Sequence, residues 1–165
     1  MAWRVYSRSM LKKVLVFAGS IIVSLAAGGI GSFATVPNIP TWYEHLDKPA
    51  LIPPNGVFGP TWSVLYVVMG IALALVILQE ANASKKPAYT WYAVQLVLNT
   101  LWSVVFFGLH QPWLAFGIII ALIASIIMTM HEFHKLLPLA MRLLVPYLAW
   151  VAFASYLNIG VAILN

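Results

Sequence analysis

The sequence of 165 residues contains no cysteine and very few charged residues. Without cysteine, disulfide bonds and thiolate chemistry are excluded. Charged residues make up 8% of the chain, and hydrophobic residues make up 62%. Because a soluble domain typically has about 25% charged residues, this composition indicates an integral membrane protein with the lipid bilayer as its surroundings.

Several functional classes lack their usual sequence features here. The chain has no nucleophile elbow, no phosphate-binding loop and no paired carboxylates. Its net charge is +5, but the basic residues form no face with interleaved aromatics, so we expect no nucleic-acid partner. No Asp, Glu, Lys or Arg lies in the middle of a long apolar segment, which argues against an ion-coupled transporter.

The four histidines do not form a recognisable metal-binding motif. His131 and His134 are three residues apart with Glu132 between them, which differs from H-E-x-x-H and offers no third ligand. His45 and His110 are far from this pair in the sequence. We therefore expect no metal site and no required cofactor.

Five apolar segments are each long enough to cross a hydrocarbon core of about 30 Å as a helix with a rise of about 1.5 Å per residue. They comprise residues 14–33, 61–78, 89–109, 113–130 and 138–164. Pro146 lies inside the fifth segment and predicts a kink there. The segments predict an all-α integral membrane protein, a five-transmembrane-helix bundle that forms a single domain over residues 1–165.

The distribution of Lys and Arg predicts the orientation of this bundle. Eight of the nine basic residues lie on one side of the predicted helices, and only Lys48 lies on the other. By the positive-inside rule, the N-terminus is cytoplasmic, whereas the connection between the first two helices and the C-terminus lie outside. The expected location is a bacterial cell membrane.

The first apolar segment has two interpretations. Its basic start, apolar run and small residues at Ala26, Ala27 and Gly28 also fit a signal peptide. We favour a retained helix because the apolar run continues to Phe33. Small residues also recur at four-residue spacing and permit close helix packing. These residues are Ser20, Ser24 and Gly28, and also Ala27 and Gly31.

Residues 42–66, which link the first two apolar segments and include the start of the second, read WYEHLDKPALIPPNGVFGPTWSVLY. Six of the ten prolines lie between Pro37 and Pro60. Since proline fixes φ and removes a backbone donor, we expect a stiff, non-helical, structured loop. Its aromatic residues suggest a lid or pocket wall rather than a linker.

Three helix faces carry aromatic rings and amides at helical spacing. They consist of Trp62, Tyr66 and Met69; of Asn99, Trp102 and Phe106; and of Tyr147, Trp150, Ala154 and Asn158. Together these faces predict an aromatic pocket beneath the loop, suited to a planar apolar ligand. The alternative is ordinary core packing, in which Asn99 and Asn158 bridge helices for roughly 0.6 kcal/mol each.

Four ordered motifs span most of the chain. Residues 42–49 read W-Y-x-x-L-x-K-P, and residues 53–62 read P-P-N-x-V-F-G-P-x-W. Residues 98–102 read L-N-x-x-W, followed by F-F-G, and residues 142–150 read R-L-L-x-P-Y-L-A-W, followed by L-N at 157–158. In this combination the chain resembles the TspO/MBR family, the tryptophan-rich sensory proteins of bacteria and the mitochondrial translocator protein (peripheral benzodiazepine receptor).

The resemblance implies a five-helix bundle, often a homodimer, that binds porphyrins and benzodiazepine- or isoquinoline-like ligands under the first loop. Protoporphyrin IX or a haem-like tetrapyrrole is then the expected ligand, and a membrane receptor or sensor is the expected function. Carried over by motif, the ligand-binding residues are Tyr43, Pro53, Trp62, Asn99, Trp102, Trp150 and Ala154. The helix faces add Phe106 and Tyr147.

Two alternative functions remain open. Some members of the family resemble enzymes that degrade protoporphyrin with light and oxygen, and Trp62 and Trp150 would then be the catalytic residues. A transporter of porphyrin or other apolar solutes is the other alternative.

The chain also departs from the family pattern. Many members have Trp where this chain has Leu51 and Gly56, so the lid is less aromatic here. Ile159 and Ile163 break the cholesterol consensus of the family, and we do not predict cholesterol binding.

Overall fold

The computed structural model describes residues 2–80 and 84–165, and within this part of the chain every regular element is a helix. The longer helices are α1 (Ala2–Asn38), α2 (Asn55–Leu78), α3 (Lys86–Ser103), α4 (Pro112–Leu136) and α6 (Val145–Leu164). Shorter elements are the 3₁₀-helix η1 (Tyr43–His45), the π-helix η2 (Val104–Gly108) and α5 (Pro138–Leu143). The predicted all-α fold is confirmed.

Five helical segments are long and apolar enough to cross a membrane. They are Met10–Asn38, Asn55–Leu78, Lys86–Gly108, Pro112–Leu136 and Pro138–Leu164. The shortest has 23 residues, which at a rise of about 1.5 Å per residue is about 35 Å. The five predicted transmembrane helices are therefore confirmed.

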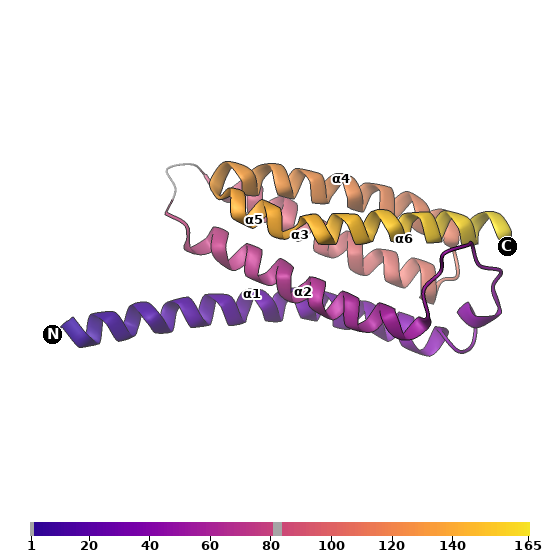
Figure 1. Cartoon of the computed structure of the whole chain (residues 1–165), viewed down its shortest axis with the longest axis horizontal. Coiled ribbons are helices and arrows are strands. Elements are labelled where there is room, and N and C mark those ends of the chain that lie inside the picture. Colours follow the sequence, from indigo (N-terminus) through magenta and orange to yellow (C-terminus); the bar gives the residue numbers. More distant parts are fainter. Residues whose placement is uncertain (1, 81–83) are drawn as a thin grey trace.

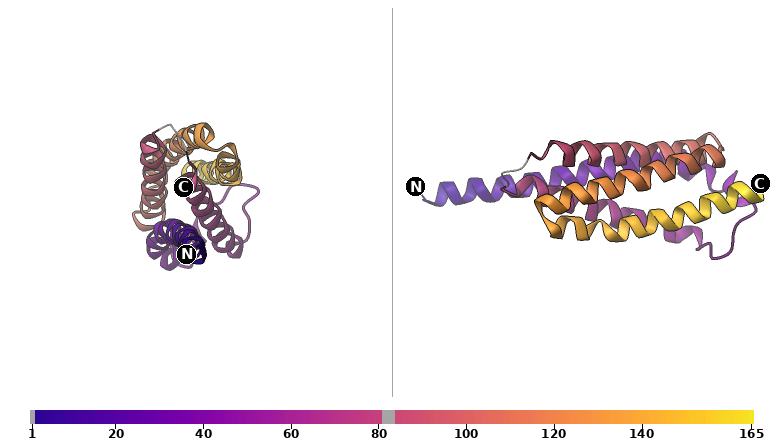
Figure 2. Two further views of the ribbon diagram at one scale, coloured as in Figure 1. Left: turned by 90° about the vertical axis from the view of Figure 1, so that its left-hand side faces the viewer. Right: turned by 90° about the horizontal axis from the view of Figure 1, so that it is seen from above.

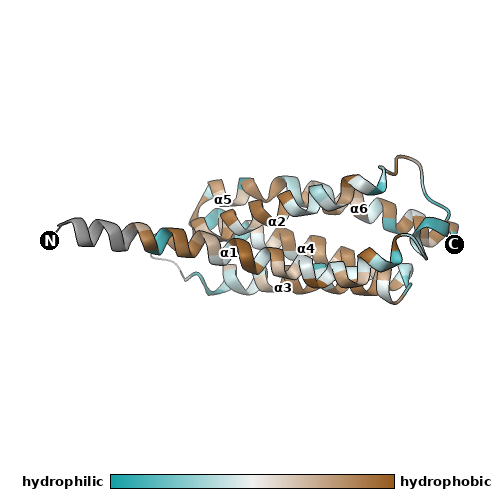
Figure 3. Cartoon of the chain, turned by 90° about the horizontal axis from the view of Figure 1, so that it is seen from below, coloured by the Kyte–Doolittle hydropathy of each residue, from teal (hydrophilic) through white to brown (hydrophobic). Residues whose placement is uncertain are grey.

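The helices lie side by side as one elongated bundle, and the N-terminal end of α1 extends past the others (Figures 1 and 2). Helix α1 packs against α2 and α3, while α4 packs against α3 and α6. Apolar side chains such as Leu15, Ile22 and Phe33 point outward, as expected next to lipid. The hydrophilic residues gather toward the loop ends of the bundle (Figure 3).

The second half of the proline-rich stretch is helical, and this part of the loop prediction was wrong. Helix α2 begins at Asn55 rather than at residue 61, and it contains Pro60. The first four N–H groups of a helix have no partner in the helix, so a proline just beyond them removes only one hydrogen bond. The connection without α-helix is thus residues 39–54, which we call the lid.

Other helix boundaries also differ from those expected. Helix α1 continues to Asn38 with Pro37 in its last turn, and α4 runs to Leu136, which brings His131 and His134 into the helix. The third span ends in η2 rather than as a regular α-helix. At the predicted kink, α5 and α6 are separated by Leu144, and Pro146 lies in the first turn of α6.

The small residues of α1 lie against the other helices. Ser20 and Ser24 are buried, and the Ser24 hydroxyl lies 2.6 Å from the Tyr92 hydroxyl on α3. A Cβ added at Gly31 would lie 3.1 Å from Ser103. The close packing that the four-residue spacing predicts is therefore present along the C-terminal half of α1.

Candidate ligand-binding site

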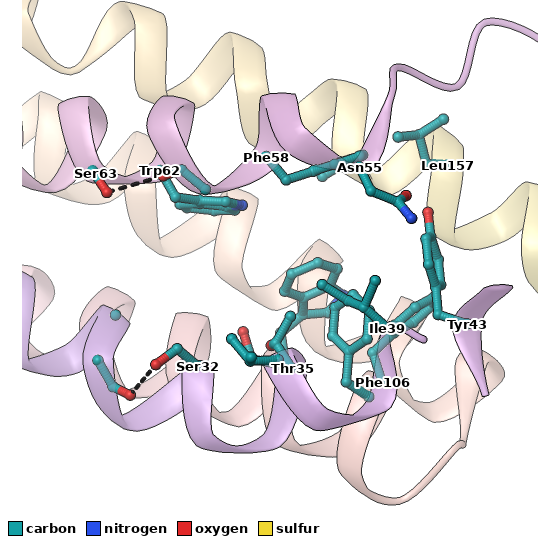
Figure 4. Close-up of a pocket in the computed structure, with 18 of the residues that line it drawn as sticks. Ser32, Thr35, Ile39, Tyr43, Asn55, Phe58, Trp62, Ser63, Phe106 and Leu157 are labelled. Atoms are coloured by element: carbon teal, nitrogen blue, oxygen red, sulfur yellow. Dashed lines mark hydrogen bonds between the residues drawn. The ribbon is translucent and has the colours of Figure 1, made fainter. Parts of the chain in front are cut away.

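A cavity of about 520 Å³ lies at the lid end of the bundle, between α1, α2, the α3–η2 segment and α6 (Figure 4). Ligand-binding pockets are typically about 300–1,000 Å³, so this volume suits a small organic molecule. The lining contains aromatic rings, small residues and hydroxyl groups, with no charged side chain among its described residues. Such a surface favours an apolar ligand.

Aromatic rings from three segments form the walls of the cavity. Trp62 on α2 has its ring centroid 6.4 Å from that of Trp102 on α3, and Trp102 stacks on Phe106 at 5.7 Å. Tyr43 of the lid meets Phe106 nearly edge-on at 6.3 Å. Aromatic pairs at these separations stabilise one another, so the flat faces are held in place before any ligand binds.

Asn158 on α6 fixes the orientation of the Trp102 indole. Trp102 Nε1 donates a hydrogen bond of 2.9 Å to Asn158 Oδ1, and Asn158 Nδ2 donates one of 2.8 Å to the Pro112 carbonyl. Trp102 therefore offers a ligand its face rather than its N–H group. Among the described residues, Trp62 Nε1 has no hydrogen-bond partner, so this indole can offer both a face and a donor.

A buried chain of polar groups supports the floor of the cavity. The Tyr66 ring lines the cavity, and its hydroxyl donates a hydrogen bond to Asn99 Oδ1. Asn99 Nδ2 donates to the Tyr147 hydroxyl at 3.2 Å, and this hydroxyl donates to Gln95 Oε1 at 2.7 Å. Asn99 and Tyr147 thus act on the cavity through Tyr66, and neither lines it.

The structure brings together five of the nine residues proposed from the sequence. These are Tyr43, Trp62, Trp102, Phe106 and Ala154. The other four do not line the cavity; they are Pro53, Asn99, Tyr147 and Trp150. Helical spacing identifies residues on one face, but it does not distinguish those that reach a cavity from those that pack behind its wall.

Among the four residues that do not line the cavity, Trp150 matters most for the proposed function. Its ring packs nearly edge-on against Phe58 of α2, at 5.9 Å, and Phe58 itself lines the cavity. Trp150 Nε1 is buried and has no partner among the described residues. As the structure stands, the two indoles proposed to face a macrocycle are therefore not equivalent.

Helix α1 forms a wall of the cavity that the sequence reasoning missed. Its lining residues are Leu25, Gly28, Gly29, Ser32, Thr35 and Val36, and Ile39 lines the cavity as the first residue of the lid. Of these, only Gly28 belongs to the small residues whose spacing predicted helix packing. Gly56 also lines the cavity. In the sequence it is notable only as a position where many members of the TspO/MBR family have tryptophan, and glycine leaves the space that the tryptophan side chain would occupy.

The lid is fastened to the C-terminal end of α6. Asp47 N donates to Asn165 Oδ1 at 3.1 Å, and Asn165 Nδ2 donates to the Asp47 carbonyl at 3.0 Å. The Tyr156 hydroxyl donates to the Ala50 carbonyl at 2.8 Å. Next to these bonds, Leu51 has a φ of 67°, an unfavourable value for leucine that the surrounding contacts hold.

We expect Gly160→Val to loosen the lid, because a Cβ at Gly160 would lie 2.6 Å from the Pro49 ring. Overpacking typically costs about 1–3 kcal/mol, so opening of the lid should become at least about fivefold more frequent. The measurement is the rate of chymotrypsin cleavage after Leu51, which is 81% exposed. Gly19→Val is the control, since a Cβ there meets nothing within 4 Å. Equal cleavage rates in both variants would contradict the packing role of Gly160.

Tyr43 is the titratable group that links the lid to the cavity. Burial raises the pKa of Tyr43 to about 12. A raised tyrosine pKa means that the docked lid favours the neutral phenol. The lid is therefore held most tightly on the bundle when the pH is below the ordinary tyrosine pKa of about 10. Its packing on the bundle weakens as the pH rises from about 10 to about 12.

This dependence can be measured as the difference in phenolate absorbance between the wild-type protein and Tyr43→Phe during an alkaline titration. The tyrosine lost in the variant should titrate near pH 12. A difference curve centred near the ordinary value of about 10 would mean that Tyr43 is not buried under the lid.

The sequence profile of the TspO/MBR family matches residues 20–164. The tryptophan-rich protein TspO of Archaeoglobus fulgidus is 40% identical over 153 residues, which cover 92% of this chain and 98% of the relative. The translocator protein of Homo sapiens is 38% identical over 119 residues, with coverage of 71% and 70%. The tryptophan-rich sensory protein of Cereibacter sphaeroides is 37% identical over 124 residues, with coverage of 75% and 77%. The chain is thus a multi-pass integral membrane protein that belongs to the TspO/MBR family.

Proposed function

We propose that this protein is a membrane receptor or sensor that binds a planar tetrapyrrole of the protoporphyrin IX type in the aromatic cavity beneath the lid. One observation carries the proposal: the neighbouring rings of Trp62, Trp102 and Phe106 line a cavity of about 520 Å³ that has no charged side chain among its described lining residues. Flat rings attract a flat macrocycle by stacking. The names of two relatives, a sensory protein and a translocator protein, are compatible with this function.

A metal-free tetrapyrrole suits this cavity better than haem does. The described lining contains no histidine, cysteine or methionine, which are the usual axial ligands of haem iron. Two tyrosines, Tyr43 and Tyr66, offer oxygen atoms, but the Tyr66 hydroxyl already donates to Asn99. Binding would therefore rest on stacking and apolar contact, with Trp62 Nε1 available as a hydrogen-bond donor.

An absorbance titration of the purified protein with protoporphyrin IX, first in darkness and then under light, tests the proposal. A receptor gives a saturable shift of the porphyrin bands in darkness that is stable under illumination. Benzodiazepine- and isoquinoline-like compounds, which also carry aromatic rings, should compete for the cavity. Absence of a saturable shift would refute tetrapyrrole binding.

The illuminated part of the same titration tests a second candidate function, light- and oxygen-dependent degradation of protoporphyrin. Trp62 is the observation that favours it, because an indole in the cavity wall would lie against a bound macrocycle. Degradation would appear as loss of the porphyrin bands that requires oxygen and slows in Trp62→Phe. Porphyrin bands that persist in the illuminated complex would dispose of this function.

We further propose that the lid and Asn165 lie outside a bacterial cell membrane and that the protein forms a homodimer. The clustering of basic residues, with Lys48 as the exception, supports the orientation. Because the chain has no cysteine, a single cysteine at Leu51 or at Lys135 can be labelled from one side of intact cells. Labelling of Lys135→Cys but not of Leu51→Cys by an impermeant reagent would contradict the orientation. A monomer mass by light scattering would contradict the homodimer.

A further inference from the structure

The walls of the cavity differ in their exposure. The residues that α6 contributes are buried, and so are Trp102 and Phe106 on the opposite wall. In contrast, Gly29 and Ser32 of α1 and Gly59 and Ser63 of α2 line the cavity and are also exposed on the outside of the bundle. Asn55 and Gly56, at the lid end of α2, do the same. Residues that reach both the cavity and the outer surface mark its opening, which lies between α1 and α2.

Helices α1 and α2 are in close contact at one end of this opening and apart at the other. A Cβ added at Gly70 would lie 2.5 Å from Ile21 Cα, and one at Gly28 would lie 2.1 Å from the Tyr66 ring. Toward the lid, a Cβ at Gly29 or Gly59 meets nothing within 4 Å. In Figure 4, Trp62 and Ser63 lie on α2 above the space, and Ser32 and Thr35 lie on α1 below it. Helices α1 and α2 are therefore in close contact from Tyr66 to Gly70 and apart between Tyr66 and the lid.

The opening lies at a depth where the surroundings are lipid. Gly29 precedes the end of α1 at Asn38 by nine residues, which is about 14 Å along the helix axis. Ser63 follows the start of α2 at Asn55 by eight residues, or about 12 Å. The hydrocarbon core is about 30 Å thick, so these positions belong to its half nearer the lid. The adjacent side chains Val36 and Val64 are apolar and more than 60% exposed, at 64% and 62%.

The lid covers the part of the cavity next to Tyr43, whereas Asn55 and Gly56 at the start of α2 line the cavity and are exposed. Tyr43 of the lid is only 6% exposed and packs on Phe106 and Phe107. Asn165 holds the lid through two hydrogen bonds with Asp47, and Pro49 fits against Gly160. A ligand that entered beneath the lid would have to break these contacts, whereas one that entered from the bilayer between α1 and α2 would not.

We propose that the cavity is filled from the bilayer, through the opening between α1 and α2 at Gly29, Ser32, Gly59 and Ser63, by ligands dissolved in the membrane. The proposal rests on the proposed function only for the identity of the ligand. It selects flat apolar molecules that partition into lipid, and it makes their rate of binding depend on their amount in the membrane. The lid then serves as a fixed roof rather than as the entrance.

A thiol placed inside the cavity tests this route without any tetrapyrrole. Since the chain has no cysteine, Ala154→Cys puts a single reporter on the buried α6 wall. The probe is benzyl methanethiosulfonate, which is apolar and partitions into the bilayer of proteoliposomes. Its reaction with the reporter should slow about tenfold when Gly59→Leu or Gly29→Leu is added, since either leucine narrows the opening. Gly117→Leu on α4, where a Cβ also meets nothing within 4 Å, should leave the rate unchanged.

Two outcomes would overturn the proposal. One is an unchanged reaction rate in both Gly59→Leu and Gly29→Leu, since then the opening is not the route. The other is an acceleration by Asn165→Ala that equals or exceeds the slowing by the leucines, since then the lid is the entrance. The thiol reaction uses no porphyrin, so a protein that fails to bind protoporphyrin IX would refute the proposed function while the entry route is still decided.

Discussion

Replacement of Trp62 by alanine is expected to weaken protoporphyrin IX binding more than replacement of any other single tryptophan. Trp62 lines the cavity and lies next to the rings of Tyr66 and Trp102. Stacking of one flat ring on an aromatic side chain contributes about 1–3 kcal/mol, which corresponds to a roughly 5- to 150-fold change in the dissociation constant. The measurement is the dark titration with quenching of porphyrin or protein fluorescence.

Matched variants separate a site effect from a general loss of tryptophan. Trp113→Ala is the control, because Trp113 is 61% exposed at the start of α4 and does not line the cavity. Trp62→Phe keeps a flat ring and should retain most of the affinity while losing the Nε1 donor. Trp150→Ala should have a smaller effect than Trp62→Ala, because Trp150 packs behind Phe58. The reverse order would mean that Phe58 moves aside and that the ligand lies against Trp150.

The second large effect is expected from Gly70→Val, which should destabilise the whole bundle. A Cβ at Gly70 would lie 2.5 Å from Ile21 Cα and 2.8 Å from Ile21 N. Because these atoms belong to the backbone, no side chain can turn away, and α1 and α2 must separate. Overpacking of this kind costs about 1–3 kcal/mol, which for a chain of this size lowers the melting temperature by roughly 2–12 °C.

Thermal unfolding in detergent, followed by circular dichroism, measures this effect. Gly117→Val replaces a glycine of α4 at a site where the added Cβ meets nothing within 4 Å. It therefore reports the effect of valine in place of glycine in a helix, without the clash. If Gly70→Val melted at the same temperature as Gly117→Val, the close contact between α1 and α2 would be refuted.

The fold could be predicted from the sequence because its main determinant is local. A run of about 20 apolar residues is sufficient to identify a spanning helix, and the kink near Pro146 follows from one residue. The start of α2 could not be predicted, since Pro60 is compatible with the early part of a helix as well as with a loop. The π-helix at Val104–Gly108 also carries no simple sequence pattern.

The candidate site was predictable only in part, because a cavity is defined by residues from different helices. Spacing placed Trp102 and Phe106 on one face, and both line the cavity. The same logic placed Tyr147 and Trp150 with Ala154 and Asn158 on α6, yet of these four only Ala154 and Asn158 line the cavity. Which part of a helix face meets open space depends on the partner helix, and one sequence does not contain that information.

The contribution of α1 illustrates the same limit. Gly28 and Gly29 are adjacent in the sequence, but a Cβ at Gly28 would strike Tyr66, whereas a Cβ at Gly29 would meet nothing within 4 Å. One glycine permits close helix packing and the other borders the opening of the cavity. The long-range contacts of the lid, such as Asp47 with Asn165, likewise follow from the folded arrangement rather than from local sequence.

The most direct test of the central claim is an experimental structure of the protein with protoporphyrin IX bound. The account predicts that the macrocycle lies in the cavity between Trp62, Trp102 and Phe106, beneath Tyr43 of the closed lid. The bundle also carries a second aromatic cluster, formed by Trp150, Phe153 and Tyr156 on α6. A macrocycle bound on that cluster, with the cavity left free of it, would contradict the account.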